Sequence, residues 1–276
     1  MKTKSFFLHM CQGVLIGLGA VLPGISGGVL SVIFGIYKPI MELLANPMHN
    51  FKTHVPMLFP VILGGIIGFL GIANLLSYVL EKYPNPSICL FVGLIGGMLP
   101  SLFREAGYKE RSKNSYIALA VSMLLVFALL ISLQFTSFTI SPSWGWFIFC
   151  GVCLALSIIV PGMSFSTLLM PLGLYTPFVD GLGHLSPSVV IPGLLGAGVT
   201  MLLLPKYVNQ LFEKHYSVAF HAIIGIVIAA TIMIVPFKGF TGSVKESLIN
   251  LFFMTAGIFL AQLLDTFNRK VKVPDL

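Results

Sequence analysis

Two copies of one short motif carry the polar chemistry of this sequence. The first copy reads PGIS at residues 23–26 and the second reads PGMS at residues 161–164. Each copy interrupts an apolar stretch, because proline lacks a backbone N–H and glycine weakens a helix. A serine just after such a break can cap the next helix, which after the first break is expected over 26–44. The free N–H groups and the partial positive charge at the start of a helix attract an anion. The two breaks therefore predict a binding site for an anion, and phosphate suits it best.

The candidate phosphate-binding residues lie in the two breaks and directly after them. Glycines allow the backbone to approach a ligand closely, and hydroxyl groups can donate hydrogen bonds to phosphate oxygens. The set comprises Pro23, Gly24, Ser26, Gly27 and Gly28 in the first break, and Pro161, Gly162, Ser164, Ser166 and Thr167 in the second. The alternative interpretation is that each break only shapes a tight turn, which Ser26 or Ser164 then caps.

The composition places these motifs in a membrane. The chain is 57% hydrophobic and 9% charged, whereas soluble domains have about 25% charged residues. Its apolar runs, such as 55–80 and 115–138, are long and continuous, which favours membrane-spanning helices over the alternating strands of a barrel. The net charge of +7 is then explained by basic residues at cytoplasmic helix ends, and no nucleic acid partner is expected. The sequence predicts an all-α polytopic membrane protein.

The chain contains an internal repeat. Residues 13–39 align with residues 151–177 without a gap, and ten of the 27 positions are identical. Further along the chain the offset changes from 138 to 132, which aligns Gly93 with Gly225. Repeats of this size are typical of secondary transporters. We expect a first repeat at 1–138 and a second at 139–276.

Each repeat is expected to hold one broken apolar segment followed by three transmembrane helices. The broken segments, 9–44 and 146–183, are interpreted as re-entrant hairpins, because residues 9–22 make only about 21 Å of helix. The expected transmembrane helices are 55–80, 87–103 and 115–138 in the first repeat, and 188–210, 217–237 and 247–268 in the second.

The distribution of positive charge favours the hairpins and predicts that the repeats are inverted. With re-entrant hairpins and a cytoplasmic N-terminus, thirteen of the sixteen lysines and arginines lie on the cytoplasmic side; with single crossings the split is eight to eight. Cytoplasmic loops carry the excess of basic residues, so the hairpin topology is preferred. A hairpin with three crossings is an odd unit, so the second copy is inverted and both termini are cytoplasmic. The two hairpin tips can then meet near the middle of the membrane.

The doubled motif resembles that of the bacterial PopT-type polyprenyl-phosphate transporters, a family long catalogued as a domain of unknown function. The matching positions are Pro23, Gly24, Ser26, Gly27, Gly28, Gly35 and Tyr37, and then Pro161, Gly162, Ser164, Ser166, Gly173 and Tyr175. The resemblance implies a flippase of the bacterial cytoplasmic membrane. Such a protein returns undecaprenyl phosphate, the lipid carrier of wall-polymer synthesis, from the outer to the inner leaflet. The sequence departs from the family pattern at Val29, Phe165, Lys38 and Thr176.

Five further polar residues are candidates for coupling or for contact with the head group. Glu42 and Asp180 occupy equivalent places late in the hairpins, where an acid either couples protons or lies at the membrane interface. Arg104 fits a topology charge better than a phosphate contact, and Lys38 is a second basic candidate. His221 either titrates or is a hydrogen-bonded core residue. No spacing of histidines and acids suggests a metal site, and no cofactor is expected.

Other functions remain as alternatives. The segment GISG at 24–27 matches the motif of rhomboid-type intramembrane serine proteases, with Ser26 as nucleophile and His221 as base. A protease gives no reason for a second, inverted PGxS motif, so we prefer a transporter and expect no enzyme activity. An anion channel and a carrier of another lipid phosphate are further alternatives, and the sequence leaves the driving ion and any homo-oligomer open. The segment CGVC at 150–153 is interpreted as apolar packing because its surroundings are hydrophobic.

Overall fold

The fold is known from a computed structural model that describes residues 3–22, 27–45, 47–108, 112–135, 140–160 and 164–270. Within these residues all regular structure is helical, which confirms the predicted all-α class. The helices are α1 (Thr3–Val21), α2 (Gly27–Ile33), α3 (Tyr37–Ala45), α4 (Pro47–Lys82), α5 (Pro84–Ala106), α6 (Lys113–Phe135), α7 (Trp144–Ile159), α8 (Phe165–Leu169), α9 (Tyr175–Gly183), α10 (Pro187–Ile234), the 3₁₀ helix η1 (Phe237–Phe240) and α11 (Val244–Lys270).

Six of the described helical segments are long and apolar enough to cross a membrane, so the chain is a multi-pass membrane protein. They are Met48–Lys82, Pro84–Ala106, Lys113–Ser132, Pro187–Phe212, Lys214–Ile234 and Val244–Thr266. Large apolar side chains on the outer faces are exposed, among them Leu124 and Leu125 on α6 and Phe259 on α11. Such faces are satisfied by lipid rather than by water.

The first and second of these segments in each half are joined by a sharp bend at equivalent positions. α10 contains a residue outside helical geometry, His215, with φ −135° and ψ 43°. Tyr83, which lies 132 residues earlier between α4 and α5, has φ −132° and ψ 61°. The same backbone conformation therefore separates two spans in both halves of the chain. α10 behaves as two helices, Pro187–Phe212 and Lys214–Ile234.

The segment after each break is not one helix, which corrects the sequence prediction of a continuous helix over 26–44. α2 ends at Ile33 and α3 begins at Tyr37. Gly35 lies between them with φ +69°, and Gly173 has the same φ between α8 and α9. A left-handed residue cannot continue a right-handed helix, and glycine adopts this conformation without a steric penalty. The helices after the breaks are therefore short.

α1 is longer than the sequence indicated. It spans 19 residues, Thr3–Val21, and so extends about 28 Å. Its apolar part, Phe6–Val21, is still shorter than the six spanning segments, as is α7. The length of a helix alone therefore distinguishes a re-entrant segment from a membrane crossing less clearly than the sequence suggested.

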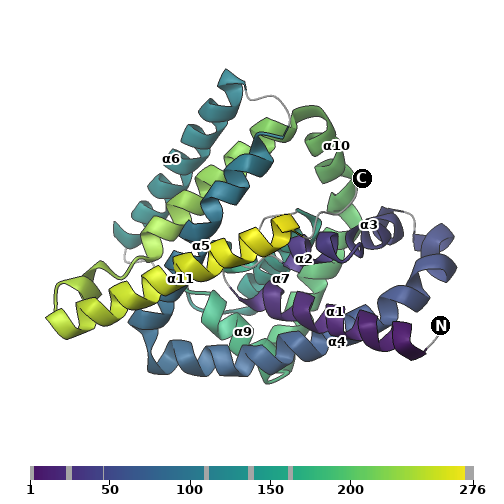
Figure 1. The fold of residues 1–276 in the computed structure, drawn as a ribbon, viewed down its shortest axis with the longest axis horizontal. Helices are drawn as coiled ribbons and strands as arrows, with labels where there is room; N and C mark the ends of the chain where they lie inside the picture. The colour runs from purple at the N-terminus through teal and green to yellow at the C-terminus, as the bar shows by residue number, and fades with distance from the viewer. Residues whose placement is uncertain are drawn as a thin grey trace.

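Glycines hold the first helix of each half against the next long helix. α1 packs along α4, and α7 packs along the first part of α10 (Figure 1). A Cβ on Gly13 would overlap the carbonyl oxygen of Val61 in α4, and a Cβ on Gly151 would overlap the carbonyl oxygen of Gly193 in α10. The same relation holds between Gly64 and Met10 and between Gly196 and Ile148. Close backbone approach through small residues is how membrane helices associate.

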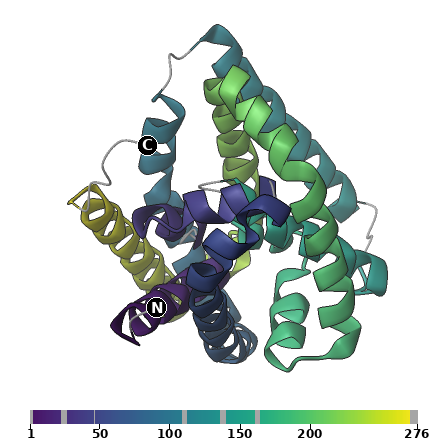
Figure 2. The same cartoon turned by 90° about the vertical axis from the view of Figure 1, so that its right-hand side faces the viewer.

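The last long helix of each half packs on the other half. α11 lies along α5, and α6 lies along the second part of α10, as Figures 1 and 2 show from two sides. A Cβ on Gly93 in α5 would overlap the carbonyl oxygen of Met254, and one on Gly225 in α10 would overlap the carbonyl oxygen of Leu119. The two halves are therefore intertwined, because each contributes a helix to the packing of the other.

The largest buried cluster lies where the two halves meet. Residues from both take part, including Val21 from α1, Phe91 from α5, Phe165 from α8 and Tyr175 from α9. Cys150 and Cys153 also belong to this cluster. All four cysteines are free thiols, and these two are packing residues of the α7 core.

Candidate functional site

The structure describes part of each motif. Gly27, Gly28, Ser164, Ser166 and Thr167 lie within the described residues. The other predicted members fall outside them: Pro23, Gly24, Ser26, Pro161 and Gly162. The geometry of the site is therefore built from the residues that flank the two breaks.

Three buried hydroxyl groups gather directly after the second break. Ser164 precedes α8 in an extended conformation, and its Oγ lies 2.7 Å from Oγ of Ser166. The Thr167 hydroxyl donates to the carbonyl oxygen of Ser164 at 2.6 Å. The Ser164 side chain does not cap α8. The Ser164 hydroxyl therefore faces the Ser166 hydroxyl in a buried place and makes no cap bond to α8.

The chain after the first break is held tightly against α1. A Cβ on Gly27 would lie 2.8 Å from the carbonyl oxygen of Ile16, so only glycine fits there without movement. The Ser31 hydroxyl donates to the carbonyl oxygen of Gly28 at 2.6 Å. Gly27, Gly28 and Ser31 are all buried. The start of α2 is thus fixed between α1 and its own first turn.

Two tyrosines bind each break to the opposite half of the chain. The Tyr37 hydroxyl donates to the carbonyl oxygen of Ile159 at 2.9 Å. The Tyr175 hydroxyl donates to the carbonyl oxygen of Val21 at 2.5 Å. Both acceptors lie at the last residue of the helix before a break, at the ends of α7 and α1. Donors and acceptors are each 138 residues apart, so the two bonds are related by the internal repeat.

The ring of Phe165, at the start of α8, contacts aromatic rings of α4 and α9. Its ring centroid lies 5.7 Å from that of Tyr175 and 6.5 Å from that of Phe69 in α4. Phe165 has no exposed surface and shares the core cluster with Val21. The bulky residue at this departure from the family pattern therefore packs the start of α8 against α4 and α9.

The two predicted acids do not join the breaks. Oε2 of Glu42 lies 2.8 Å from Nε2 of His54 in α4. Oδ1 of Asp180 accepts a hydrogen bond from Ser77 at 3.0 Å and lies 3.3 Å from Nδ1 of His184. Both carboxylates have a histidine neighbour, and both are partly exposed. Their contacts with His54 and Ser77 tie α3 and α9 to α4.

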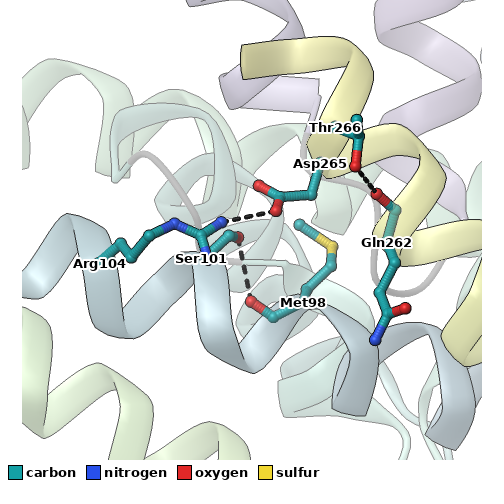
Figure 3. A network of polar contacts seen from close by, with 6 residues as sticks. All are labelled: Met98, Ser101, Arg104, Gln262, Asp265 and Thr266. Carbon is teal, nitrogen blue, oxygen red and sulfur yellow. Dashed lines mark hydrogen bonds and ion pairs between the residues drawn. The ribbon is translucent and has the colours of Figure 1, made fainter.

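Arg104 has a carboxylate partner in the opposite half. Its Nη2 lies 2.6 Å from Oδ2 of Asp265 (Figure 3). The pair joins α5 to α11, next to the Ser101 hydroxyl, which donates to the carbonyl oxygen of Met98 at 3.0 Å. The ion pair holds α11 of the second half against α5 of the first. Lys38, the other basic candidate, is exposed on α3.

His221 lies beside a second hydrophobic cluster, which includes Phe103. Its neighbours come from α5, α6 and α10, and its ring contacts are Tyr116 and Phe103. Its Nδ1 lies 2.7 Å from the carbonyl oxygen of Ser217. The described contacts of this ring come from α5, α6 and α10, so they give no support to a dyad with Ser26, which lies outside the described residues.

Sequence reasoning did not assign the partners that hold this site. The crossing bonds of Tyr37 and Tyr175 were not anticipated, although both tyrosines belong to the matched motif positions. Their signal was their equivalence in the repeat, two residues after a glycine in each half. His54 and Ser77 carried no signal, because their roles depend only on the packing of α4.

Comparison with known proteins gives a consistent result. A family described as undecaprenyl phosphate translocase-like matches residues 1–116 and 106–251. A curated protein of Vibrio cholerae named polyprenyl-phosphate transporter is 24% identical over 251 residues, covering 86% of this chain and 80% of the relative. One of Staphylococcus aureus with the same name is 24% identical over 245 residues, covering 83% and 86%. No solved structure gives a significant match.

Proposed function

This chain belongs to the undecaprenyl phosphate translocase-like family, and on that basis we propose that it is a transporter of a polyprenyl phosphate. Relatives named polyprenyl-phosphate transporter align with more than four fifths of the chain. The proposed substrate is undecaprenyl phosphate, moved from the outer to the inner leaflet of a bacterial cytoplasmic membrane for reuse in cell-wall polymer synthesis. It is not proposed to be an enzyme.

The observation that best supports one site shared by both breaks is the pair of hydrogen bonds from Tyr37 and Tyr175. Tyr37 and Tyr175 each tie the end of the helix before one break to the other half. Because each bond joins one half of the chain to the other, the pair would limit how far the two breaks can move apart. We infer that the tips of both hairpins face one phosphate head group, while the polyprenyl tail stays in lipid.

The proposed phosphate contacts are backbone N–H groups after the breaks together with the serine hydroxyls. α2 has seven residues and α8 has five, so their helix dipoles contribute less than a long helix would. The facing hydroxyls of Ser164 and Ser166 can each donate to a phosphate oxygen once their mutual bond opens. Ser26 is the corresponding residue of the first motif.

We further propose that the repeats are inverted and that the broken segments are re-entrant hairpins. The charge distribution of the sequence supports this topology and a cytoplasmic position of both termini. The crossing bonds at equivalent positions are expected if the two hairpins face each other across a pseudo-twofold axis. A cysteine placed near each terminus should then react with a membrane-impermeant maleimide only after the cells are opened.

The packing of α11 on α5 and of α6 on α10 bears on which parts of the protein can move. Rocking of one whole repeat against the other would pull α11 from α5 and α6 from α10. Glycines such as Gly93 and Gly225 bring these helices into close backbone contact. The Arg104–Asp265 ion pair adds to the contact between α5 and α11. We propose instead that the hairpin regions with α4 and the first part of α10 move relative to these two exchanged pairs.

The first experiment compares binding of three lipids to the purified protein by native mass spectrometry. Undecaprenyl phosphate should bind more tightly than undecaprenol or undecaprenyl diphosphate. Ser26→Ala with Ser164→Ala should weaken binding of the monophosphate. The matched control is Ser101→Ala, because the Ser101 hydroxyl bonds only within its own helix in the described contacts.

Four results would each contradict a part of the proposal. Equal binding of the uncharged alcohol would mean that the tips do not recognise phosphate. Unchanged binding in the double serine variant would place the head group elsewhere. Comparable binding of short, unrelated lipid phosphates would indicate a carrier of another lipid, and labelling of Ser26 by an active-serine probe would revive the protease alternative.

A further inference from the structure

The two bends between spanning segments share a backbone conformation but differ in its cause. Tyr83, at the first bend, has φ −132° and ψ 61°, and His215, at the second, has φ −135° and ψ 43°. Tyr83 is followed by Pro84, and the helical region is disfavoured for a residue that precedes proline. His215 is followed by Tyr216, which imposes no such restriction. The sequence therefore determines the first bend locally, whereas the second bend depends on contacts within the fold.

A buried serine also holds the first bend. The Oγ of Ser87 lies 2.6 Å from the carbonyl oxygen of Tyr83 and 3.3 Å from that of Val79, so its hydroxyl links α5 to the end of α4. The backbone N–H of Ser87 donates to the same Tyr83 carbonyl oxygen at 3.1 Å. The residue equivalent to Ser87 in the second half, 132 positions later, is Ala219. The second bend therefore lacks this hydroxyl.

Aromatic rings hold the second bend instead. The ring centroid of Phe212, just before the bend, lies 5.8 Å from that of Tyr216 and 5.3 Å from that of Phe220, both after the bend. The three rings pack in the cluster that α10 forms with the end of α5, and the Tyr216 hydroxyl donates to Glu105 of α5. Aromatic pairs are favourable in both offset and edge-to-face arrangements. The Phe212 ring can therefore shift on its partners, which a directed hydrogen bond does not allow.

The second bend joins two closely packed pairs of helices. Before the bend, the first part of α10 is in close backbone contact with α7 through Gly151 and Gly196. After the bend, the second part of α10 is bound to α6, where the Ser122 hydroxyl donates to the carbonyl oxygen of Ala222 at 2.8 Å. Hinges between such parts are single residues at the ends of elements, which absorb a change in φ and ψ. The residue with non-helical geometry at the second bend has this position.

We propose that His215 is a hinge and that the packing of Phe212 on Tyr216 and Phe220 holds it at its present angle. When the Phe212 ring leaves these partners, the first part of α10 swings together with α7, whereas the bend at Tyr83 keeps its angle. Within the group of helices proposed to move, α7 and the first part of α10 therefore move further than α4. That this movement carries a lipid across the membrane rests on the proposed function.

The first test measures distances across both bends and requires no substrate. Pairs of spin labels are attached to cysteines at exposed positions, and the exposed native thiol of Cys11 is replaced by serine. One pair spans the second bend, from α10 to α6, and the other spans the first bend, from α4 to α11: Leu203 with Leu125, and Leu75 with Phe259. Pulsed electron spin resonance in lipid nanodiscs gives the distribution of distances for each pair. The pair across the second bend should have the broader distribution.

Two variants should change these distances in opposite directions. Phe212→Ala should broaden the distribution across the second bend and leave that across the first bend unchanged. Ala219→Ser gives the second bend the hydroxyl that Ser87 supplies at the first, so it should narrow the distribution without removing a side chain. The control Ala120→Ser, at an exposed position of α6, should change neither distribution. Distances across the second bend that stay the same in both variants, or an equal broadening across both bends in Phe212→Ala, would overturn the inference.

The second test asks whether the hinge serves transport. The protein is placed in vesicles that contain undecaprenyl phosphate, and movement of the lipid between leaflets is followed. Ala219→Ser should slow this movement and leave binding of the lipid in native mass spectrometry unchanged, whereas Ala120→Ser should keep both. Normal lipid movement in Ala219→Ser, with distances that have narrowed, would exclude a role of the hinge in transport. Absence of lipid movement in the unmodified protein would contradict the proposed function, and the distances would still decide the hinge.

Discussion

Tyr37 and Tyr175 each donate a hydrogen bond to the half of the chain to which they do not belong. Tyr37 binds the carbonyl oxygen of Ile159 and Tyr175 binds that of Val21. The last carbonyl groups of a helix have no partner within it, so each hydroxyl satisfies an acceptor that the break would leave open. The bonds therefore stabilise the ends of α7 and α1 and tie each of them to the opposite half of the chain.

Removing one of these hydroxyls should destabilise the protein. Tyr175→Phe leaves the buried carbonyl oxygen of Val21 unsatisfied, which costs about 1–3 kcal/mol. Tyr37→Phe should have a smaller effect, because Tyr37 is less buried than Tyr175. Thermal unfolding in detergent measures both effects. Loss of polyprenyl phosphate binding beyond the loss of stability would further indicate that the bonds position the tips.

The control for both variants is Tyr207→Phe. The Tyr207 side chain is exposed on α10, so removal of its hydroxyl should change the free energy of unfolding little. A melting temperature that is equal in Tyr175→Phe and Tyr207→Phe would contradict the importance of the crossing bond.

Substitution of either glycine with positive φ should destabilise the protein because of the backbone conformation alone. Gly35 and Gly173 have φ +69°, and a Cβ on either would meet no atom within 4 Å. Alanine there costs about 1–2 kcal/mol from the left-handed conformation. Asparagine, which tolerates that region, should cost less. Gly71→Ala is the matched control, because Gly71 also has open space but lies inside α4, where alanine favours the helix.

The sequence was informative about periodicity and about the positions of the breaks, and less so about the segments after them. Long apolar runs predicted the helical membrane class, and the PGxS motifs predicted where α1 and α7 end. The split at Gly35 was missed because the segment around it is continuously apolar and a single glycine is tolerated within a helix. Only its positive φ in the folded chain distinguishes it from the helical Gly71.

Contacts between distant segments were not predictable from one sequence. The exchange of α6 and α11 between halves depends on which glycine faces which helix, and the sequence does not encode that locally. The same holds for the carboxylates. Glu42 and Asp180 were recognised as equivalent, but their histidine neighbours differ in origin, His54 from α4 and His184 from the end of α9.

The closely packed glycines should tolerate no added side chain. A Cβ on Gly64 would overlap the carbonyl oxygen of Met10, and one on Gly196 would overlap that of Ile148. Alanine at either position forces α1 from α4 or α7 from α10, and overpacking of this kind costs about 1–3 kcal/mol. Gly198→Ala is the control, because a Cβ there meets nothing within 4 Å. Similar yields and melting temperatures for Gly196→Ala and Gly198→Ala would disprove the proposed packing.

The Arg104–Asp265 pair offers a way to separate a structural role from a contact with phosphate. If the pair only joins α5 to α11, Arg104→Gln and Asp265→Asn should lower the melting temperature similarly. Combining both changes should then add less than the sum of the two, because the partner is already lost. The expected coupling is about 1 kcal/mol or less, since the Arg104 side chain is 46% exposed. Binding of undecaprenyl phosphate should remain unchanged in both variants. A loss of binding in Arg104→Gln but not in Asp265→Asn would instead place the guanidinium at the head group.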